Sequence, residues 1–289
     1  MDLYFSKHES FYPRIGWLRK GLDAIKENNH IFLEKTNAME ELGIGSNMVK
    51  ALRYWLTAFD LTKERTNSKS QTIQEITDLG KKLLDFDEYF EDIGTFWILH
   101  FRLAQKRTNA PTWYWFYNHF SHISFNKETF INNLSKYIKR LGEKVPAERS
   151  LINDYNVLRR MYLYDPQENI TEEKSFMSPF RDLKLIMKEK SDSYKKNSPD
   201  FDTLDPKIYF YCLLMSIDEK DEDINLNEIL SAQKSVGKIF NLNMNIMHEF
   251  LGVLQEERLL RINKQAGMNS IKIIQNDKNK VLQDYYRNI

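Results

Sequence analysis

Residues 36–61 constrain the fold of this chain more than any other segment, because they have the pattern of two helices joined by a glycine-bracketed turn. Gly43 follows Leu42 where a helix must end in a left-handed conformation, which glycine adopts at little cost. Gly45 and Ser46 then start the second helix. Helical spacing predicts a buried face on this helix made of Met48, Val49, Leu52, Trp55, Leu56 and Phe59.

The opposite face of the second helix is polar and basic, and no acidic residue lies between Ser46 and Phe59. An asparagine suits an adenine edge, whereas lysine and arginine suit phosphate or guanine. The pattern predicts a helix that enters the major groove of double-stranded DNA. An ordinary helical hairpin with a solvated polar face is the alternative. The candidate DNA-binding residues on this face are Ser46, Asn47, Lys50, Arg53 and Tyr54.

A polar, basic turn follows within residues 62–76, flanked by segments that can pair as short strands. A hairpin directly after a recognition helix is typical of the wing of a winged helix. Lys63, Arg65 and Lys69 would then lie beside the sugar-phosphate backbone. The hairpin therefore favours DNA binding over the ordinary helical hairpin.

Composition limits the classes of protein that the chain can belong to. Its 289 residues, 42% of them hydrophobic, can bury a full core in two or three compact units. Its formal net charge is only +1, so affinity for nucleic acid must come from a local basic surface. The single cysteine, Cys212, excludes a disulfide framework and a cysteine-based zinc site. Without a signal segment or an apolar stretch near the ~20 residues of a membrane span, we expect a cytoplasmic protein with no membrane partner.

Strong periodic patterns along the chain are nearly all helical, which predicts a mainly α protein with small β-wings. Residues 95–120 are dense in aromatic side chains, for which a central core is the simplest explanation and base stacking the alternative. We predict two winged-helix-like units joined by this helical, aromatic-rich middle region. The predicted units are residues 1–92, 93–190 and 200–289.

The C-terminal unit repeats the order of helices followed by a strand, a glycine turn and a strand. The solvent face of its long helix is acidic rather than basic, with Asn245, His248, Glu249, Glu256 and Glu257, and would repel phosphate. We interpret this unit as a partner-docking or homodimerisation module. Its wing, residues 264–272, is its only candidate contact with a DNA backbone.

Two polar clusters are candidates for chemistry. His8, Glu9 and Arg14 fall in a short aromatic-flanked stretch, where arginine could hold a phosphate and His8 or Glu9 could move a proton. The second cluster is acidic and precedes His100, and its candidate metal ligands are Glu91 and Asp92. A helix N-terminus rich in acids, or a solvated rim, is the alternative for the acidic cluster. The chain has no glycine-rich phosphate loop, GxSxG elbow or HExxH zinc helix.

Several strings resemble, in the same order, the domain of unknown function 4007 family of bacterial proteins: FSKHESFYPRIGWLRKGLDA, LGIGSNMVKALRYWLTAF, TDLG, DEYFEDIGTFWILH, WYWFYNHF, SFMSPFRDLKLI and SVGKIFNL. The resemblance covers nearly the whole chain. It implies a component of a bacterial DNA phosphorothioation locus, in which a non-bridging backbone oxygen is replaced by sulfur and the mark supports defence against phage. One branch of the family is described as the nicking component of the single-strand system, beside a cysteine desulfurase and an ATP-dependent activating enzyme.

The residues that carry this resemblance are His8, Glu9, Arg14, Gly43, Gly45, Asn47, Met48, Glu91, Asp92, Trp97 and His100. Two departures affect loop geometry. Lys7 replaces the usual glycine, and Asp87 with Glu88 replaces an aspartate-proline pair. Neither departure removes a group with an assigned chemical role.

The first functional hypothesis is a DNA-binding component of a phosphorothioation or anti-phage system that either nicks one strand, as a metal-dependent nickase, or presents that strand. Its hydrolytic centre would draw on His8, Glu9, Arg14, Asp92 and His100. Magnesium or manganese would be its cofactor, and no other cofactor is expected. The alternatives are a non-catalytic adaptor that docks other phosphorothioation proteins, and a transcriptional regulator of the same locus.

Overall fold

The computed structural model describes residues 3–33, 35–68, 70–166, 177–217, 223–265 and 268–287. Its helices are α1 (Trp17–Glu27), α2 (Lys35–Leu42), α3 (Ser46–Ala58), α4 (Asp78–Phe86), α5 (Ile93–Ala104), α6 (Pro111–Asn118), α7 (Lys127–Arg140), α8 (Glu148–Tyr162), the 3-10 helix η2 (Pro179–Leu183), α9 (Pro206–Ser216), α10 (Leu226–Ser231), α11 (Val236–Ile239), α12 (Met244–Glu256) and α13 (Lys278–Tyr286). Its strands are β1 (Thr62–Thr66), β2 (Thr72–Ile76), β3 (Ser124–Phe125), β4 (Leu163–Tyr164), β5 (Ile186–Lys190), β6 (Ser193–Lys196), β7 (Ile224–Asn225), β8 (Leu260–Gln265) and β9 (Met268–Ile273).

The strands form three small sheets. β1 and β2 are an antiparallel pair, β3-β6-β5-β4 is a four-stranded sheet in which β4 and β5 are parallel, and β7-β9-β8 is three-stranded. Helices make up about half of the described residues, and strands make up a much smaller share. The architecture is therefore mixed α/β, and the prediction of a mainly α protein with two winged-helix-like units is wrong.

The four-stranded sheet explains the error. Its strands lie between and after the segments whose spacing predicted helices, and its two edge strands, β3 and β4, are two residues long. A strand of that length has no alternation of polar and apolar residues to detect. The expected strands at both ends of the chain are confirmed, because β1 pairs with β2 and β8 pairs with β9.

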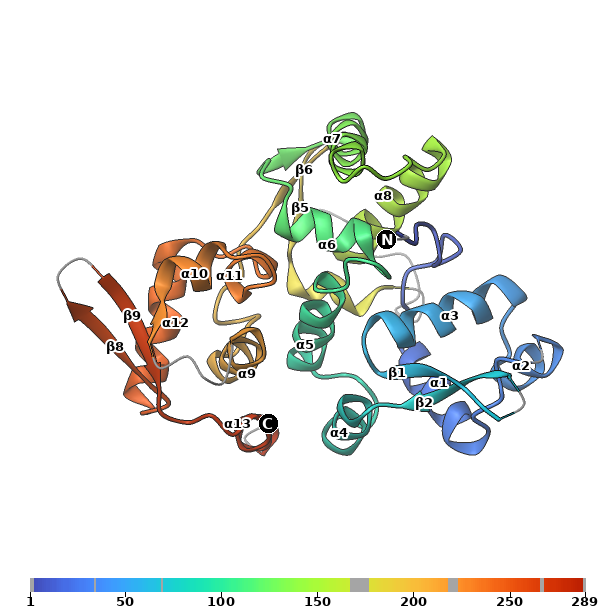
Figure 1. The fold of residues 1–289 in the computed structure, drawn as a ribbon, viewed down its shortest axis with the longest axis horizontal. Helices are drawn as coiled ribbons and strands as arrows, with labels where there is room; N and C mark the ends of the chain where they lie inside the picture. Colours follow the sequence, from blue (N-terminus) through green and yellow to red (C-terminus); the bar gives the residue numbers. More distant parts are fainter. Residues whose placement is uncertain are drawn as a thin grey trace.

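The aromatic-rich helices α5 and α6 lie at the centre of the molecule, between the N-terminal and C-terminal helices (Figure 1). Trp97 and Phe101 of α5, and Trp113 and Phe116 of α6, are fully buried. This burial confirms the central-core interpretation of residues 95–120. The apolar face of α3 joins the same core, as its spacing predicted.

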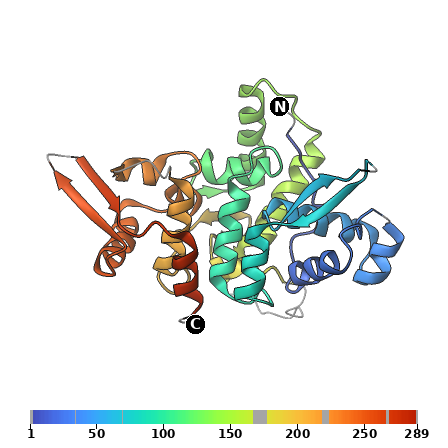
Figure 2. The ribbon, with the colours of Figure 1, turned by 60° about the horizontal axis from the view of Figure 1, so that its bottom comes forward.

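The C-terminal helix α13 packs against α9 and also contacts the start of α5 (Figure 2). Tyr286 stacks on Phe86 with ring centroids 5.2 Å apart, and its hydroxyl lies 2.5 Å from Thr95 Oγ1. Gly94 is required at this contact, because a Cβ atom there would lie 2.5 Å from the Tyr285 hydroxyl oxygen. These contacts join chain segments that are far apart in sequence. The predicted boundaries of the three units stay a prediction.

Among the helices of the described ranges, none combines the length and the apolar character that crossing a lipid bilayer requires.

Candidate functional site

A cleft of about 500 Å³ opens between the N-terminal loop, the polar face of α3, strand β1 and the turn before α6. We call it the α3 cleft. It brings together Glu9, Lys50, Arg53 and Tyr54, which the sequence had placed in two separate candidate sites. The residues lining it are Tyr4, Lys7, Glu9, Lys50, Arg53, Tyr54, Thr57, Ala58, Glu64 and Asn109.

The cations of α3 reach solvent, but each is paired with an acid from another segment. Lys50 Nζ lies 3.2 Å from Glu9 Oε1, and the Arg53 guanidinium lies 2.8 Å from Glu64 Oε1. The side chains of Lys50 and Arg53 are 44% and 30% exposed. Lys50 Nζ also donates to Asn47 Oδ1 over 3.3 Å. The basic flank of α3 is therefore accessible, with its charge partly neutralised in the free protein.

The hairpin cations are paired in the same way. Arg65 and Lys63 of β1 lie 3.0 and 3.6 Å from the carboxylate of Glu75 on β2. The hydrogen bond from Arg65 lowers the pKa of Glu75. Lys69 lies outside the described residues. Ser46 is the first residue of α3 and does not line the cleft.

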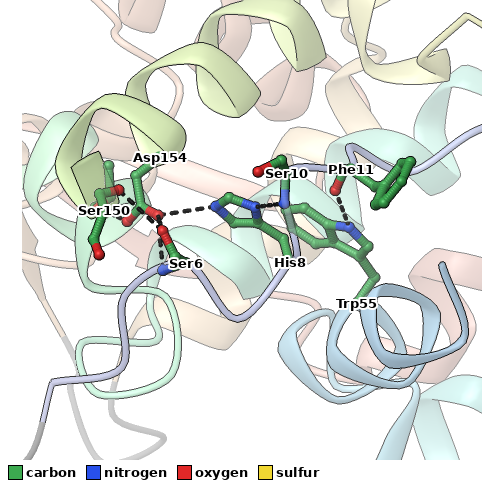
Figure 3. A network of polar contacts seen from close by, with 8 residues as sticks. Ser6, His8, Ser10, Phe11, Trp55, Ser150 and Asp154 are labelled. Carbon is green, nitrogen blue, oxygen red and sulfur yellow. Dashed lines mark hydrogen bonds and ion pairs between the residues drawn. The ribbon is translucent and has the colours of Figure 1, made fainter. Parts of the chain in front are cut away.

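His8 lies between Lys7 and Glu9, which line the α3 cleft, and is only 1% exposed. Figure 3 shows its side chain within a network of polar contacts. Its Nε2 is 2.9 Å from Asp154 Oδ1, while Nδ1 accepts from the Ser10 backbone N–H over 3.2 Å. These two contacts fix the tautomer in which Nε2 carries the proton and donates to the carboxylate. The ring is also nearly parallel to Trp55, with centroids 6.0 Å apart.

Asp154 is the centre of this buried network. Its Oδ1 also accepts from the Ser6 backbone N–H over 2.8 Å, and its Oδ2 accepts from Thr112 Oγ1 over 2.5 Å. Burial raises the pKa of the neighbouring Tyr54 phenol well above its ordinary value, and the Asp154 charge raises it further. Tyr54 therefore faces the cleft as a neutral ring.

The loop above the network is held in an unusual conformation. Ser6, Glu9 and Ser10 have φ values of 54°, 49° and 67°, in the left-handed region that non-glycine residues avoid. Each such residue costs on the order of 1–3 kcal/mol, so the surrounding structure must enforce it. The contacts of Asp154 with Ser6 and His8 supply that constraint and direct Glu9 toward Lys50.

Arg14 lies outside the α3 cleft. Its guanidinium carbon is 5.9 Å from the Phe11 ring centroid and 5.5 Å from that of Trp17. This is the geometry of a cation held over aromatic faces. Arg14 is thus separated from the cleft that receives Glu9.

Asp92 caps the N-terminus of α5. Its Oδ1 accepts from the backbone N–H groups of Gly94 and Thr95 over 2.8 and 3.3 Å and from the Tyr285 hydroxyl over 2.9 Å. Burial raises the pKa of Asp92, although these hydrogen bonds oppose the shift. Oδ1 of Asp92 is thus engaged in capping, and the role of Glu91 and Asp92 as metal ligands stays a prediction. Within the described ranges, no group of three or more His, Cys, Asp or Glu side chains could hold one.

His100 is fully buried in α5. Its Nε2 lies 3.0 Å from the Ile239 carbonyl oxygen, and its Nδ1 lies 2.9 Å from the Tyr162 hydroxyl. Burial lowers the pKa of His100 to about 3, so the imidazole is neutral at physiological pH. The structure does not bring His8, Asp92 and His100 into one site, because each has its own set of partners. Their catalytic roles stay a prediction.

The sequence analysis missed Asp154 as the partner of His8. A signal was present, because Asp154 lies on the same helix face as the buried Leu151, Tyr155 and Leu158. An acid within an apolar stripe indicates a buried polar partner. The other missed residues line the cleft and come from separate segments, namely Tyr4, Lys7, Glu64 and Asn109.

Comparison with known proteins extends the resemblance over the whole fold. The family model described as "Protein of unknown function (DUF4007)" matches residues 5–286. A crystal structure of magnesium ion-bound SspB is similar to this chain, with a TM-score of 0.87 and 26% identity over 98% of this chain and 88% of that one. A second SspB crystal structure gives the same values. No curated protein matches the chain by sequence. The family match covers nearly every residue, and the chain therefore belongs to the domain of unknown function 4007 family.

Proposed function

We propose that this protein is a DNA-binding component of a bacterial DNA phosphorothioation system and that it binds duplex through the α3 cleft. The pathway is supported by family membership and by the likeness to SspB, which belongs to phosphorothioation systems. The DNA-binding role is supported by the residues of this chain. The observation that carries it is the convergence of Lys7, Lys50 and Arg53 on one accessible cleft.

Two aromatic rings accompany these cations. Tyr4 is 43% exposed at the rim, with Lys7 Nζ 5.4 Å from its ring centroid, and Tyr54 presents its neutral ring within the cleft. Cations interleaved with aromatic faces suit a nucleic-acid strand, because phosphates meet the charges and sugars or bases meet the rings. The backbone of Tyr4 is itself fixed, since its N–H donates to the Thr108 carbonyl over 3.0 Å.

Binding would exchange the two ion pairs of the cleft for contacts with phosphate. Lys50 would leave Glu9 and Arg53 would leave Glu64. An exposed ion pair contributes only about 0–1 kcal/mol, so the exchange costs little. Each phosphate contact releases condensed counterions from DNA, which favours the bound state at low salt. The acids therefore limit non-specific binding without preventing a specific complex.

A double substitution tests this role. Lys50→Gln with Arg53→Gln should weaken duplex binding and reduce the slope of log affinity against log salt by about 1.8, at about 0.9 per lost contact. Fluorescence anisotropy with a labelled duplex at several salt concentrations measures both. Lys127→Gln with Lys280→Gln is the matched control, because it removes the same charge from two exposed residues outside the cleft. Equal slopes for the two double variants would overturn the assignment of the cleft.

Nicking is the second candidate function, favoured by the magnesium bound to the similar SspB structure and by the resemblance to a nicking component. Incubation of supercoiled plasmid with the protein and magnesium or manganese tests it. Metal-dependent relaxed circles would identify a nickase. DNA binding without relaxed circles would instead favour the adaptor or the regulator, and a footprint at the protein's own promoter would separate those two.

A further inference from the structure

A second group of cations comes from the segment before α6, the residue after it and the segment around α11, which contacts α6, and none of its members lines the α3 cleft. We call it the α6 basic patch and define it as Arg107, His119, Lys234 and Lys238. The Arg107 N–H donates to the Gln105 carbonyl, and the Gln105 side chain donates to the Lys234 carbonyl over 3.5 Å. The Lys234 N–H in turn donates to Asn118 Oδ1 over 2.6 Å, at the residue before His119, and Lys238 lies on α11. Among the residues that the structure describes, no carboxylate forms an ion pair with Arg107, Lys234 or Lys238. The patch thus differs from the α3 cleft, in which acids neutralise the cations.

His119 is half-buried at the centre of the patch. Its ring centroid lies 5.4 Å from that of Tyr114 on α6 and 4.8 Å from that of Tyr137 on α7. Neither ring nitrogen has a hydrogen-bond partner within the described ranges. Burial lowers the pKa of His119, and the charges of Lys238 and Arg107 lower it further. A partly desolvated imidazole beside two cations lacks the polar partner that such a group ordinarily has.

The surroundings of the patch add donors rather than acceptors. The Tyr114 hydroxyl donates to Gln233 Oε1 over 2.9 Å, which leaves the amide hydrogens of Gln233 available. Lys196 Nζ donates to the carbonyls of Phe116 and Phe120 over 2.5 and 2.7 Å. Burial lowers the pKa of Lys196 to about 7, and the charge of Lys238 contributes to this shift. Among the described residues, none of these contacts brings a carboxylate to the patch.

We propose that the α6 basic patch is a phosphate-binding site distinct from the α3 cleft. The Arg107 guanidinium can hold two oxygens of a phosphate, Lys238 supplies a point charge, and His119 donates from one ring nitrogen. The phosphate belongs either to a nucleic-acid backbone or to a small phosphorylated molecule. The inference stands whether or not α3 contacts DNA. The turn before α6 contributes to both surfaces, because Asn109 lines the α3 cleft and Arg107 belongs to the α6 basic patch.

NMR of the full chain with labelled histidines tests the proposal, with His119→Gln used to assign the His119 signals. Inorganic phosphate at millimolar concentration should raise the pKa of His119 by about 1, because a nearby anion stabilises the imidazolium. In the free protein, burial and the charges of Lys238 and Arg107 lower this pKa, and the rings of Tyr114 and Tyr137 pack against the imidazole. A merely structural histidine would keep its pKa when phosphate is added.

Two further probes, a 20-nucleotide single strand and the corresponding duplex, distinguish the sources of the phosphate. A response to either at micromolar concentration identifies a nucleic-acid backbone, whereas a response to inorganic phosphate alone identifies a small ligand. Arg107→Gln with Lys238→Gln should weaken the response roughly tenfold, and Lys127→Gln with Lys280→Gln should leave it unchanged. If no probe moves the pKa of His119 in the folded wild-type protein, the proposal is overturned.

Discussion

His8 and His100 are both buried against α6, yet their partners differ. His8 contacts Trp113 edge-on at 5.6 Å, and His100 contacts Tyr117, one helical turn further along, at 4.5 Å. His8 donates to the carboxylate of Asp154, whereas His100 meets only a backbone carbonyl and a phenol. One histidine therefore has a charged partner and the other has neutral partners.

Each histidine also anchors a segment that supplies one cationic surface. His8 fixes the loop that carries Lys7 and Glu9 into the α3 cleft. His100 holds the carbonyl of Ile239 on α11, the residue that follows Lys238 of the α6 basic patch. A buried histidine near charged residues can thus position them without itself touching a ligand.

The largest predicted effect is the pH dependence of stability that His100 causes. The pKa of His100 is about 3 in the folded protein and about 6.5 when unfolded, so the unfolded state binds the proton first as pH falls. The contribution of His100 to stability is complete above pH 6.5 and is lost toward pH 3. At about 1.36 kcal/mol per pKa unit, the loss between pH 7 and pH 4 is about 3 kcal/mol.

Urea unfolding of the wild type and of His100→Gln at both pH values measures this loss. The variant keeps an amide donor for the Ile239 carbonyl but cannot titrate. Its stability should therefore fall by about 3 kcal/mol less than that of the wild type between pH 7 and pH 4. The carboxylates common to both proteins cancel in the difference. Identical pH dependence would show that His100 does not carry the acid sensitivity.

The next largest effect concerns the partner of His8. Asp154→Ala leaves buried donors of Ser6, His8 and Thr112 without their acceptor, which should destabilise the protein by about 3 kcal/mol. Loosening of the loop should also weaken duplex binding at the α3 cleft.

The α6 basic patch provides the control for Asp154→Ala at the α3 cleft. The response of His119 to phosphate should survive Asp154→Ala, because the patch rests on other contacts. Asp78→Ala, at an aspartate whose side chain is 92% exposed, should change the free energy of unfolding by no more than about 0.5 kcal/mol. A loss of both binding responses in a folded Asp154→Ala protein would contradict the separate anchoring of the two surfaces.

Local patterns in the sequence predicted much of the N-terminal fold. The helix now observed at Ser46–Ala58 and the hairpin that follows it were both expected, and Val49, Leu52 and Trp55 are buried as their spacing required. These features depend on neighbours within a few residues. The predicted mainly α class failed where a sheet joins strands from distant segments, such as β3 with β6.

The candidate site was predictable only in part for the same physical reason. The polar face of α3 contains no acid, but Glu9 arrives from a loop 41 residues away and Glu64 from the next hairpin. His8 meets Asp154 across 146 residues. Pairs of this kind are set by tertiary packing, so the cations of α3 were visible in the sequence while their partners were not.

The smallest predicted effect isolates those acidic partners. Glu9→Gln with Glu64→Gln removes the carboxylates that compete with phosphate for Lys50 and Arg53, so duplex binding should tighten about threefold to tenfold at low salt. Glu256→Gln with Glu257→Gln, at the exposed last residue of α12 and the residue after it, changes the net charge equally and should tighten binding less than twofold. Fluorescence anisotropy at two salt concentrations measures both. Equal gains would mean that net charge, rather than local competition within the α3 cleft, controls the affinity.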